Sequence, residues 1–199
     1  TLELARQLGG YAVLSTYSRL VIDPNRGSDD PTLVMKLYDG SIVEGNRRVD
    51  DAEIDRRIAT LWRPYHDAVD AALDAAGAEK VLVSIHSFTP QLRGRPVRPW
   101  HVGILWDRDD RLVVPMLARL RAEGDLVVGN NEPYSGRLEG DGMMKHGTGR
   151  DIPHVLIEVR NDLIADPEGE AHWARRLAPV LRGAISDMRL AEVSETHQF

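Results

Sequence analysis

Polar side chains end or interrupt apolar segments of this sequence, and their types suit a metal or ligand site. His86 follows the β-branched run 81–85, and Glu158 interrupts the apolar run Val155–Val159. A neutral imidazole at the end of a strand is a good ligand for a divalent ion. A carboxylate in a buried strand is costly unless it is paired or lines a hydrated site. The structural alternatives are a core histidine bonded to backbone and a carboxylate paired with Arg160 or another arginine.

A second group of polar residues lies in the segment 19–26, where an apolar run ends at Pro24. Its members are Arg19, Asp23, Asn25 and Arg26. An amide and a guanidinium together can donate to one carboxylate in a fixed orientation, so Asn25 and Arg26 suit an acidic ligand. The alternative is an ordinary surface turn, which Asp-Pro-Asn sequences form readily.

Further candidates lie in segments that are expected to be irregular. Asn131 and Tyr134 occupy a loop bounded by Gly and Pro, where they could bind substrate, polarise a carbonyl or simply form a turn. His146 is expected in a mobile loop, as a general acid, an oxyanion donor or a solvent-exposed residue. Ser87, which the strand 81–85 delivers together with its histidine, is a candidate for substrate binding.

The remaining histidines and glycines do not indicate other chemistry. We interpret His66 and His101 as structural residues and His172 and His197 as surface residues. The stretch 147–149 lacks the strand, the helix and the Lys-Ser or Lys-Thr pair of a phosphate-binding loop. No Gly-x-Ser-x-Gly nucleophile elbow occurs. Nucleotide binding and serine hydrolysis are therefore not expected.

Apolar spacing and turn residues predict strands that alternate with helices. The predicted strands are 11–17, 81–85, 100–105, 126–128 and 155–159, and the predicted helices are 2–8, one from Asp50 or Asp51 to Gly77, one from Leu112 to Gly124, and about 168–188. A long irregular loop is expected over 27–46, with a turn at Asp39–Gly40. This order implies a three-layer α/β/α sandwich with a mixed, mostly parallel central sheet and a ligand site at the carboxyl ends of its strands.

Length and composition limit the class of protein. A chain of 199 residues that is 42% hydrophobic predicts one domain over residues 1–199. The net charge of -6 argues against nucleic acid or an anionic membrane as a partner and favours a small molecule. The sequence has no cysteine, so His, Asp and Glu must hold any metal, and the cytoplasm is the expected location. The longest apolar runs are far shorter than the roughly 20 residues that span a bilayer.

Five motifs, in this order along the chain, resemble the N-formylglutamate amidohydrolase family. They are residues 15–26, 84–90, 98–103, 131–135 and 153–164, and the similarity runs from about residue 12 to residue 181. That family is similar to zinc carboxypeptidases and aspartoacylases, which implies an α/β/α fold and a metal-bound water that attacks an amide carbonyl. The implied reaction converts N-formyl-L-glutamate to formate and L-glutamate, as in histidine degradation.

The resemblance also implies roles for individual residues. His86 matches a zinc-ligand histidine, and Glu158 matches the carboxylate that activates the water and passes its proton to the leaving amine. Asn25 and Arg26 match the pair that grips the substrate carboxylate, and Arg19 is implied to polarise the carbonyl. Asp23, Asn131 and Tyr134 are implied in substrate binding by the motifs in which they lie, and His146 is kept as a catalytic candidate.

One expected motif of the family has no match in this sequence. The family carries an acidic-His motif near its start, and residues 1–20 contain nothing similar. A zinc hydrolase needs three protein ligands as a rule. We therefore expect that the chain lacks an N-terminal strand and that the other ligands for Zn²⁺, or for another divalent metal, lie upstream of Thr1. The alternatives are a relative that binds an acidic ligand without metal and a hydrolase of another N-acyl acidic amino acid.

Overall fold

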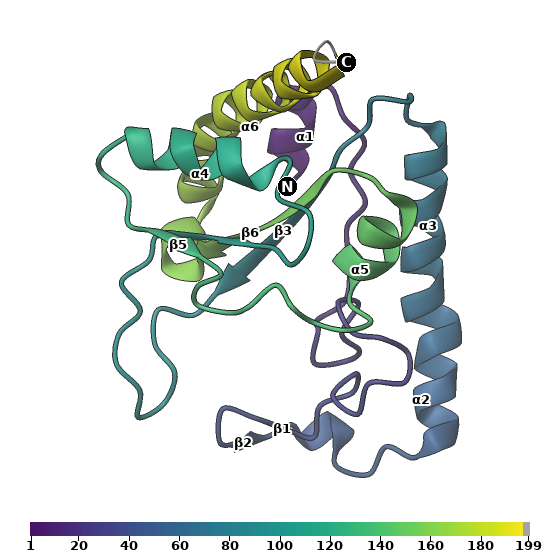
Figure 1. The fold of residues 1–199 in the computed structure, drawn as a ribbon. Coiled ribbons are helices and arrows are strands. Elements are labelled where there is room, and N and C mark those ends of the chain that lie inside the picture. Colours follow the sequence, from purple (N-terminus) through teal and green to yellow (C-terminus); the bar gives the residue numbers. More distant parts are fainter. Residues whose placement is uncertain (197–199) are drawn as a thin grey trace.

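A four-stranded mixed sheet forms the centre of the protein (Figure 1). The structure is a computed structural model that describes residues 1–196, with side chains described through residue 191. In spatial order the strands are β3 (Leu82–Phe88), β6 (His154–Arg160), β4 (Val102–Leu105) and β5 (Val128–Asn130). The pairs β3–β6 and β4–β5 are parallel, whereas β6 and β4 are antiparallel. The predicted mixed, mostly parallel sheet is confirmed.

Helices lie on both sides of this sheet (Figure 1). They are α1 (Leu2–Leu8), α2 (Asp51–Arg57), α3 (Arg63–Ala75), α4 (Val113–Ala122), α5 (Gly142–His146) and α6 (Pro167–Thr196), with a π-helical turn at Ile58–Trp62 and 3₁₀ turns at Glu44–Asn46, Thr148–Arg150 and Asn161–Ile164. Helices α1, α4 and α6 share the main apolar core with the sheet. Within residues 1–196, no helix combines the length and the apolar character that crossing a bilayer requires.

Side-chain alternation along β6 separates the core from the polar residues. Val155, Ile157 and Val159 are at most 2% exposed and belong to the core that α4 and α6 complete. Successive side chains of a strand point to opposite faces. Glu158 therefore lies on the face that is turned away from this core.

Local signals set several element boundaries as expected. Gly9 takes a left-handed conformation with φ of 70° and ends α1, and Gly124 does the same after α4 with φ of 79°. The Asp50 carboxylate accepts a hydrogen bond from the Glu53 backbone N–H at 2.9 Å and caps α2. Asp39 and Gly40 both have positive φ and join β1 (Leu37–Tyr38) to β2 (Ser41–Ile42).

Other predicted elements are wrong. Residues 11–17 form no strand, and their apolar side chains Tyr11, Leu14 and Tyr17 are 68%, 42% and 54% exposed. A strand needs a neighbouring edge, and no described segment pairs with these residues. The strand expected at 126–128 is shifted to Val128–Asn130. The segment around His146 contains helix α5, whose five residues are too few for a periodic pattern to show.

A loop backbone lies directly against the sheet at two glycines. Gly103 and Gly129 are partners across β4 and β5. A Cβ atom on Gly129 would lie 2.5 Å from the carbonyl oxygen of Glu132, and one on Gly103 would overlap that same oxygen. Since a side chain at either position would displace the loop, these glycines allow residues 131–136 to cover this face.

Gly103→Ala is expected to lower the free energy of unfolding by about 1–3 kcal/mol, because the new methyl group must push backbone atoms of Glu132 away. Urea denaturation measures this change. Gly77→Ala is the matched control, because nothing lies within 4 Å of a Cβ atom there. Equal stability of the two variants would show that the loop yields without cost.

Candidate active site

His86 and Glu158 are neighbours across β3 and β6, where their Cα atoms are in register. Residues in register on parallel strands have side chains on the same face of a sheet. Burial lowers the pKa of His86 to about 4, so its imidazole is neutral at pH 7. Its Nε2 atom lies 3.0 Å from Ser84 Oγ. The two strands therefore present a neutral imidazole and a carboxyl group side by side.

Glu158 is a buried acid without a complete set of partners. It is 6% exposed, and its Oε2 atom has no hydrogen-bond partner among the described residues. Burial raises the pKa of Glu158 to about 7, although the positive charges of Arg19 and Arg98 act in the opposite direction. A carboxyl group with a pKa near neutrality exchanges protons readily at physiological pH, as a general base must.

Asp23 organises the segment that faces His86. This carboxylate is 3% exposed, accepts a hydrogen bond from Arg19 Nη2 at 2.7 Å, and accepts another from the Asn25 backbone N–H at 2.9 Å. After burial, the largest influence on the pKa of His86 is the charge of Asp23, which raises it, while Arg19 and Arg26 lower it. The structure thus brings Arg19, Asp23 and Arg26 together with His86.

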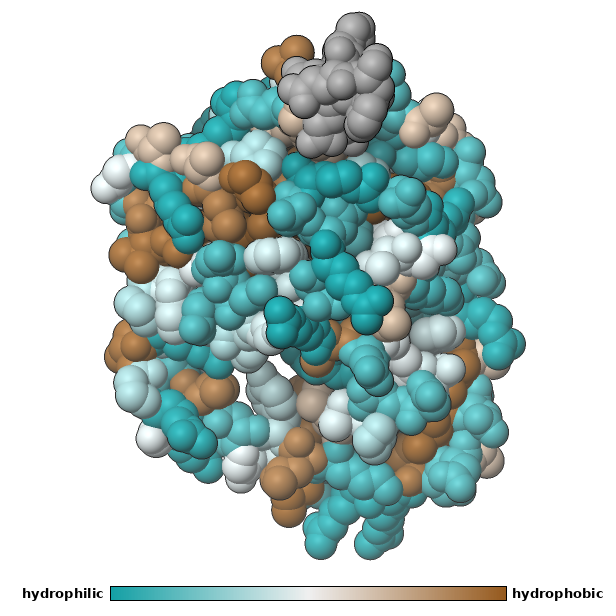
Figure 2. Space-filling view, in the orientation of Figure 1, coloured by the Kyte–Doolittle hydropathy of each residue, from teal (hydrophilic) through white to brown (hydrophobic). Residues whose placement is uncertain are grey.

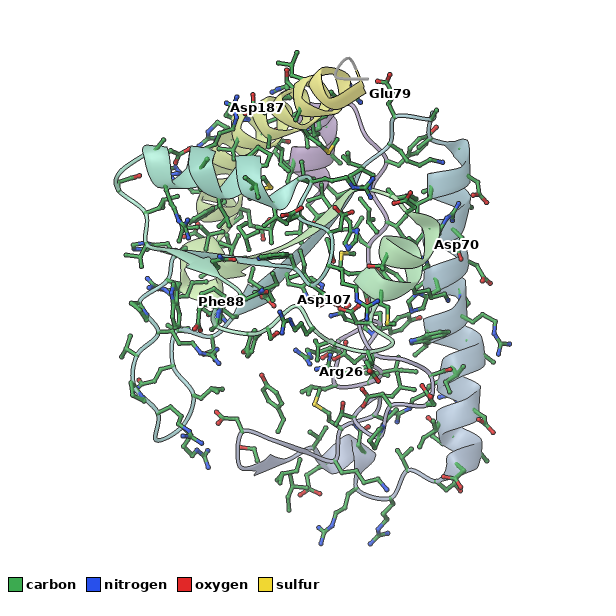
Figure 3. The ribbon with its side chains drawn as sticks, viewed as in Figure 1. Arg26, Asp70, Glu79, Phe88, Asp107 and Asp187 are labelled. Atoms are coloured by element: carbon green, nitrogen blue, oxygen red, sulfur yellow. The ribbon has the colours of Figure 1, made fainter. Side chains whose placement is uncertain are left out.

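The backbone around Asn25 and Arg26 is held from two helical regions. The carbonyl of Arg26 accepts a hydrogen bond from Trp62 Nε1 at 3.0 Å, and Asn25 Oδ1 accepts one from the Gly142 N–H at 3.2 Å. The Arg26 side chain donates to Thr32 Oγ1 at 3.2 Å. Figure 3 shows Arg26 in the irregular segment between the sheet and the β1–β2 hairpin. The ion pair of Arg26 itself is longer, with 3.9 Å between Arg26 Nε and the Asp30 carboxylate.

Arg98 is a further cation of this site, and it is not among the residues predicted from the sequence. Its Nη1 atom donates to the Tyr134 hydroxyl at 2.9 Å and to the Thr89 carbonyl at 3.0 Å. Its guanidinium carbon lies 4.8 Å from the centre of the Tyr134 ring. Burial raises the pKa of Tyr134, and Arg98 lowers it. The available signal was the position of Arg98 at the start of the motif 98–103.

Ser87 is not brought to the sheet face of Glu158, and Asn131 has turn-forming contacts within its loop. Asn131 Oδ1 accepts hydrogen bonds from the backbone N–H groups of Trp106 at 2.9 Å and Gly136 at 3.0 Å. These contacts, with a φ of 53°, match the turn-forming alternative for Asn131. Ser87 is exposed and pairs in register with Val159, so it lies on the sheet face opposite to Glu158.

His146 lies in a buried network with α3, which corrects the expectation of a mobile loop and the alternative of a solvent-exposed residue. It is 2% exposed and sits at the end of α5. Its Nε2 atom is 2.7 Å from His66 Nδ1, and its Nδ1 atom is 2.9 Å from Asp70 Oδ1. Burial lowers the pKa of His146, and the charges that act on it are those of Asp70, Lys145 and Arg150. A catalytic role for His146 stays a prediction.

His146→Ala is expected to lower the free energy of unfolding by about 2–4 kcal/mol, because it opens a cavity and leaves the buried His66 ring without its partner. Urea denaturation checks this value. His172→Ala is the control, since His172 is exposed on α6, as predicted, and should change stability by less than about 0.5 kcal/mol. His197 lies outside the described residues. A loss no larger than the control's would show that the histidine contact stabilises nothing.

Comparison with known proteins places the chain in a family. The family model described as N-formylglutamate amidohydrolase matches residues 1–165. The chain belongs to this family. The N-formylglutamate deformylase of Pseudomonas putida is 28% identical over 161 residues, which are 72% of this chain and 59% of that protein. The chain thus spans less than two thirds of that relative. The N-formylglutamate deformylase of Pseudomonas aeruginosa is 25% identical over 205 residues, which are 94% of this chain and 76% of that protein.

Solved structures agree with this family membership. The gene product Atu2144 of Agrobacterium tumefaciens is 33% identical with a TM-score of 0.78, and the match covers 94% of this chain and 77% of that one. The N-formylglutamate amidohydrolase of Ralstonia eutropha JMP134 is 24% identical with a TM-score of 0.55, over 88% and 76% of the two chains. At this identity the second likeness shows the fold alone. The α/β fold that the sequence predicted is thus shared with an N-formylglutamate amidohydrolase of known structure.

The described part of this family member does not complete a zinc site. No group of three or more His, Cys, Asp or Glu side chains within residues 1–191 is arranged to hold a metal ion. His86 is neutral and has the chemistry of a ligand, but structural and catalytic zinc sites use at least three protein ligands. His86 thus stays a candidate ligand, and the described residues do not complete a set of three around it.

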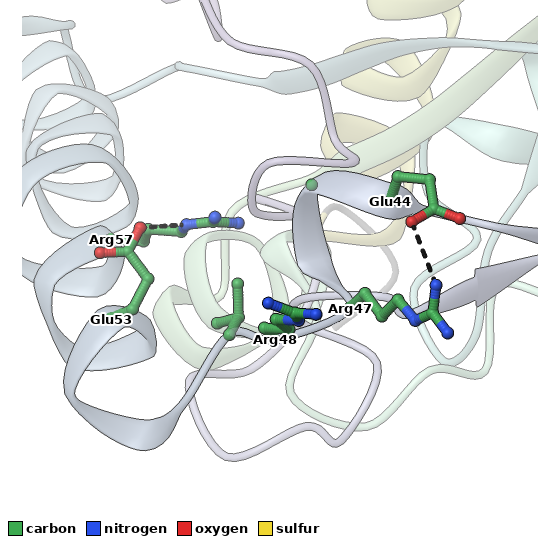
Figure 4. Close-up of a pocket in the computed structure, with 7 residues that line it drawn as sticks. Glu44, Arg47, Arg48, Glu53 and Arg57 are labelled. Atoms are coloured by element: carbon green, nitrogen blue, oxygen red, sulfur yellow. Dashed lines mark hydrogen bonds and ion pairs between the residues drawn. The ribbon is translucent and has the colours of Figure 1, made fainter.

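Two hollows on the surface of this chain are separate from the candidate site around His86 and Glu158. One hollow of about 440 Å³ lies between residues 44–49 and α2 (Figure 4), and two of the guanidinium groups that line it already face carboxylates, in the pairs Arg57–Glu53 and Arg47–Glu44. A second hollow, of about 480 Å³, lies against the start of α6. Neither is lined by His86 or Glu158. Figure 2 shows an opening in the surface between the β1–β2 hairpin and the adjacent loops of the sheet.

Stability is expected to fall as pH rises, because of Glu158. Its pKa is about 7 in the fold and 4.5 ordinarily, so the native state binds its proton more tightly than the unfolded chain does. The resulting loss, between about pH 4.5 and about pH 7, amounts to about 3 kcal/mol. Urea denaturation at about pH 5 and about pH 8 measures it. Glu158→Gln should remove this part of the pH dependence, and an unchanged profile would contradict the assignment.

Proposed function

We propose that this chain hydrolyses N-formyl-L-glutamate to formate and L-glutamate. The observation that carries the proposal is the buried Glu158, whose Oε2 atom has no partner among the described residues and whose neighbour across the strands is the neutral His86. The names of the two Pseudomonas relatives support the choice of substrate. Histidine degradation in the cytoplasm is the setting that we expect for this reaction.

Glu158 acts as the proton carrier in the proposed mechanism. Its carboxylate accepts a proton from the attacking water as the water oxygen bonds to the formyl carbon. The C–N bond then breaks, and the carboxyl group returns the proton to the leaving nitrogen, which gives formic acid and the free amine. At neutral pH formic acid loses its proton and the amine gains one, so the final products are formate and L-glutamate. A pKa of about 7 suits both transfers, because neither protonation state is strongly favoured.

Three neighbouring side chains position the substrate in this proposal. Arg19 donates to the formyl oxygen and stabilises the negative charge that develops on it. Asp23 orients Arg19 through their 2.7 Å contact. Arg26, with the adjacent Asn25, binds a carboxylate of the substrate, and the Trp62 and Gly142 contacts reduce the entropy that binding would otherwise cost.

We also propose that His86 is one ligand of a divalent ion, with Zn²⁺ favoured. Its low pKa supports this role because a metal ligand must be unprotonated. The described residues supply no complete site, and no step above depends on the ion. Calorimetric titration with Zn²⁺ tests the assignment, since His86→Ala should abolish uptake that His172→Ala leaves unchanged.

Formate release tests the proposed function. The chain is incubated with N-formyl, N-acetyl and N-succinyl derivatives of L-glutamate and L-aspartate, with and without added Zn²⁺. Formate production that is fastest for N-formyl-L-glutamate supports the proposal. Acetate or succinate release instead would indicate another N-acyl substrate. Binding of these acids without release of any acyl group would indicate the non-catalytic alternative.

A further inference from the structure

Arg98 carries a positive charge that no protein carboxylate neutralises by direct contact. Among the described residues it forms no ion pair. Both of its side-chain hydrogen bonds use Nη1, to the Thr89 carbonyl and the Tyr134 hydroxyl. Nε and Nη2 have no hydrogen-bond partner within the described part of the chain, so two donors of a half-buried guanidinium are available.

The two anchors of Arg98 come from the elements that frame the candidate site. Thr89 directly follows β3, three residues after His86. Tyr134 belongs to the loop that lies on Gly103, and Gly103 is in register with Glu158. Arg98 thus bridges the end of the strand that bears His86 and the loop that covers the strand beside Glu158.

Aromatic rings hold the guanidinium in place. Its central carbon is 4.8 Å from the Tyr134 ring centre and 5.8 Å from that of Phe88, which lies two residues beyond His86 and so on the same face of β3. Contacts with ring faces, together with the two hydrogen bonds, restrict the rotamers of Arg98. A cation that is fixed before its ligand arrives binds with a smaller loss of entropy.

We propose that Arg98, oriented by Tyr134, binds the side-chain carboxylate of the substrate and thereby selects dicarboxylic N-acyl amino acids. This inference rests on the proposed hydrolysis of N-formyl-L-glutamate, whose other carboxylate is assigned to Asn25 and Arg26. Two separate cationic groups then match the two carboxylates. The electrostatic influence of Arg98 on Glu158 agrees with its place at the site.

Arg98 should discriminate between a side-chain carboxylate and a side-chain amide, because an amide leaves one guanidinium donor without a partner. A guanidinium forms two parallel hydrogen bonds with a carboxylate, whereas the side-chain amide of N-formyl-L-glutamine offers one oxygen and a repelling NH₂ group. Sites built for a specific polar group reject analogues that lack it. The wild-type protein should therefore bind N-formyl-L-glutamate more tightly than N-formyl-L-glutamine.

The test compares the affinities of these two compounds by calorimetry in the Glu158→Gln background, where turnover does not interfere. Arg98→Met should weaken binding of N-formyl-L-glutamate by about 10- to 100-fold and change that of N-formyl-L-glutamine by less than about 3-fold. Arg98→Lys keeps the charge without the planar fork, so its affinity for N-formyl-L-glutamate should lie between those of the wild type and Arg98→Met. Arg95→Met is the matched control, because Arg95 is an exposed arginine of the same loop.

Tyr134→Phe gives a second measurement that keeps the ring and removes only the hydroxyl that orients Arg98. It should reduce the preference for N-formyl-L-glutamate by about 3- to 10-fold, whether or not Arg98→Met folds. Equal weakening of both compounds, or unchanged preference in both variants, would overturn the role of Arg98. That result would leave the proposed function intact if the wild type releases formate. A different outcome is that the wild type releases no formate but prefers N-formyl-L-glutamate, and that Arg98→Met loses this preference. That outcome would refute hydrolysis and support the carboxylate-binding role of Arg98.

Discussion

Glu158→Gln is expected to reduce kcat for N-formyl-L-glutamate by about 10²- to 10⁴-fold, because the amide cannot accept the proton of the attacking water. Glutamine has nearly the same shape as glutamate, so the change removes a proton acceptor and little packing. Substrate affinity should stay within about 3-fold of the wild type, since Glu158 is not assigned to carboxylate binding. Stopped formate assays give kcat, and calorimetry gives the affinity.

The stability of the same variant distinguishes a chemical role from a structural one. If Glu158 were retained only for packing or for an unseen ion pair, Glu158→Gln would lower stability at about pH 8. The raised pKa of Glu158 predicts the opposite, namely a variant more stable than the wild type at that pH. A variant that is fully active and no more stable would remove Glu158 from the mechanism.

Arg26→Met is expected to raise KM for N-formyl-L-glutamate by about 10- to 100-fold with a much smaller effect on kcat. Its guanidinium is assigned to a carboxylate that is bound equally in the ground state and the transition state, and loss of such uniform binding appears in KM. Steady-state formate release over a range of substrate concentrations separates the two constants.

Two further variants control for this result. Arg26→Lys retains the charge but not the planar fork, so it should recover only part of the affinity. Arg47→Met removes an exposed arginine that contacts Glu44 beside the hollow of Figure 4, and it should leave both constants unchanged. A fall in kcat without a change in KM for Arg26→Met would reassign Arg26 from carboxylate binding to transition-state stabilisation.

The sequence alone determined the features that depend on neighbouring residues. Glycines and a capping aspartate predicted helix ends, as at Gly9, Asp50 and Gly124, because φ preferences and cap bonds act over a few residues. The apolar run that Glu158 interrupts predicted a buried strand with one polar position. Five ordered motifs indicated the family, and the family model that matches residues 1–165 confirmed it.

Only the tertiary structure decided which segments meet. The sequence pattern of 11–17 favours a strand, yet these residues pair with no described edge, because strand formation depends on a partner that is often distant in the chain. The placement of β6 between β3 and β4 put Glu158 between His86 and Gly103. This strand order allows the loop that lies on Gly103 to bring Tyr134 into contact with Arg98. A contact between residues 36 positions apart leaves no periodic or local signal, so it follows from the sheet order and not from the sequence pattern.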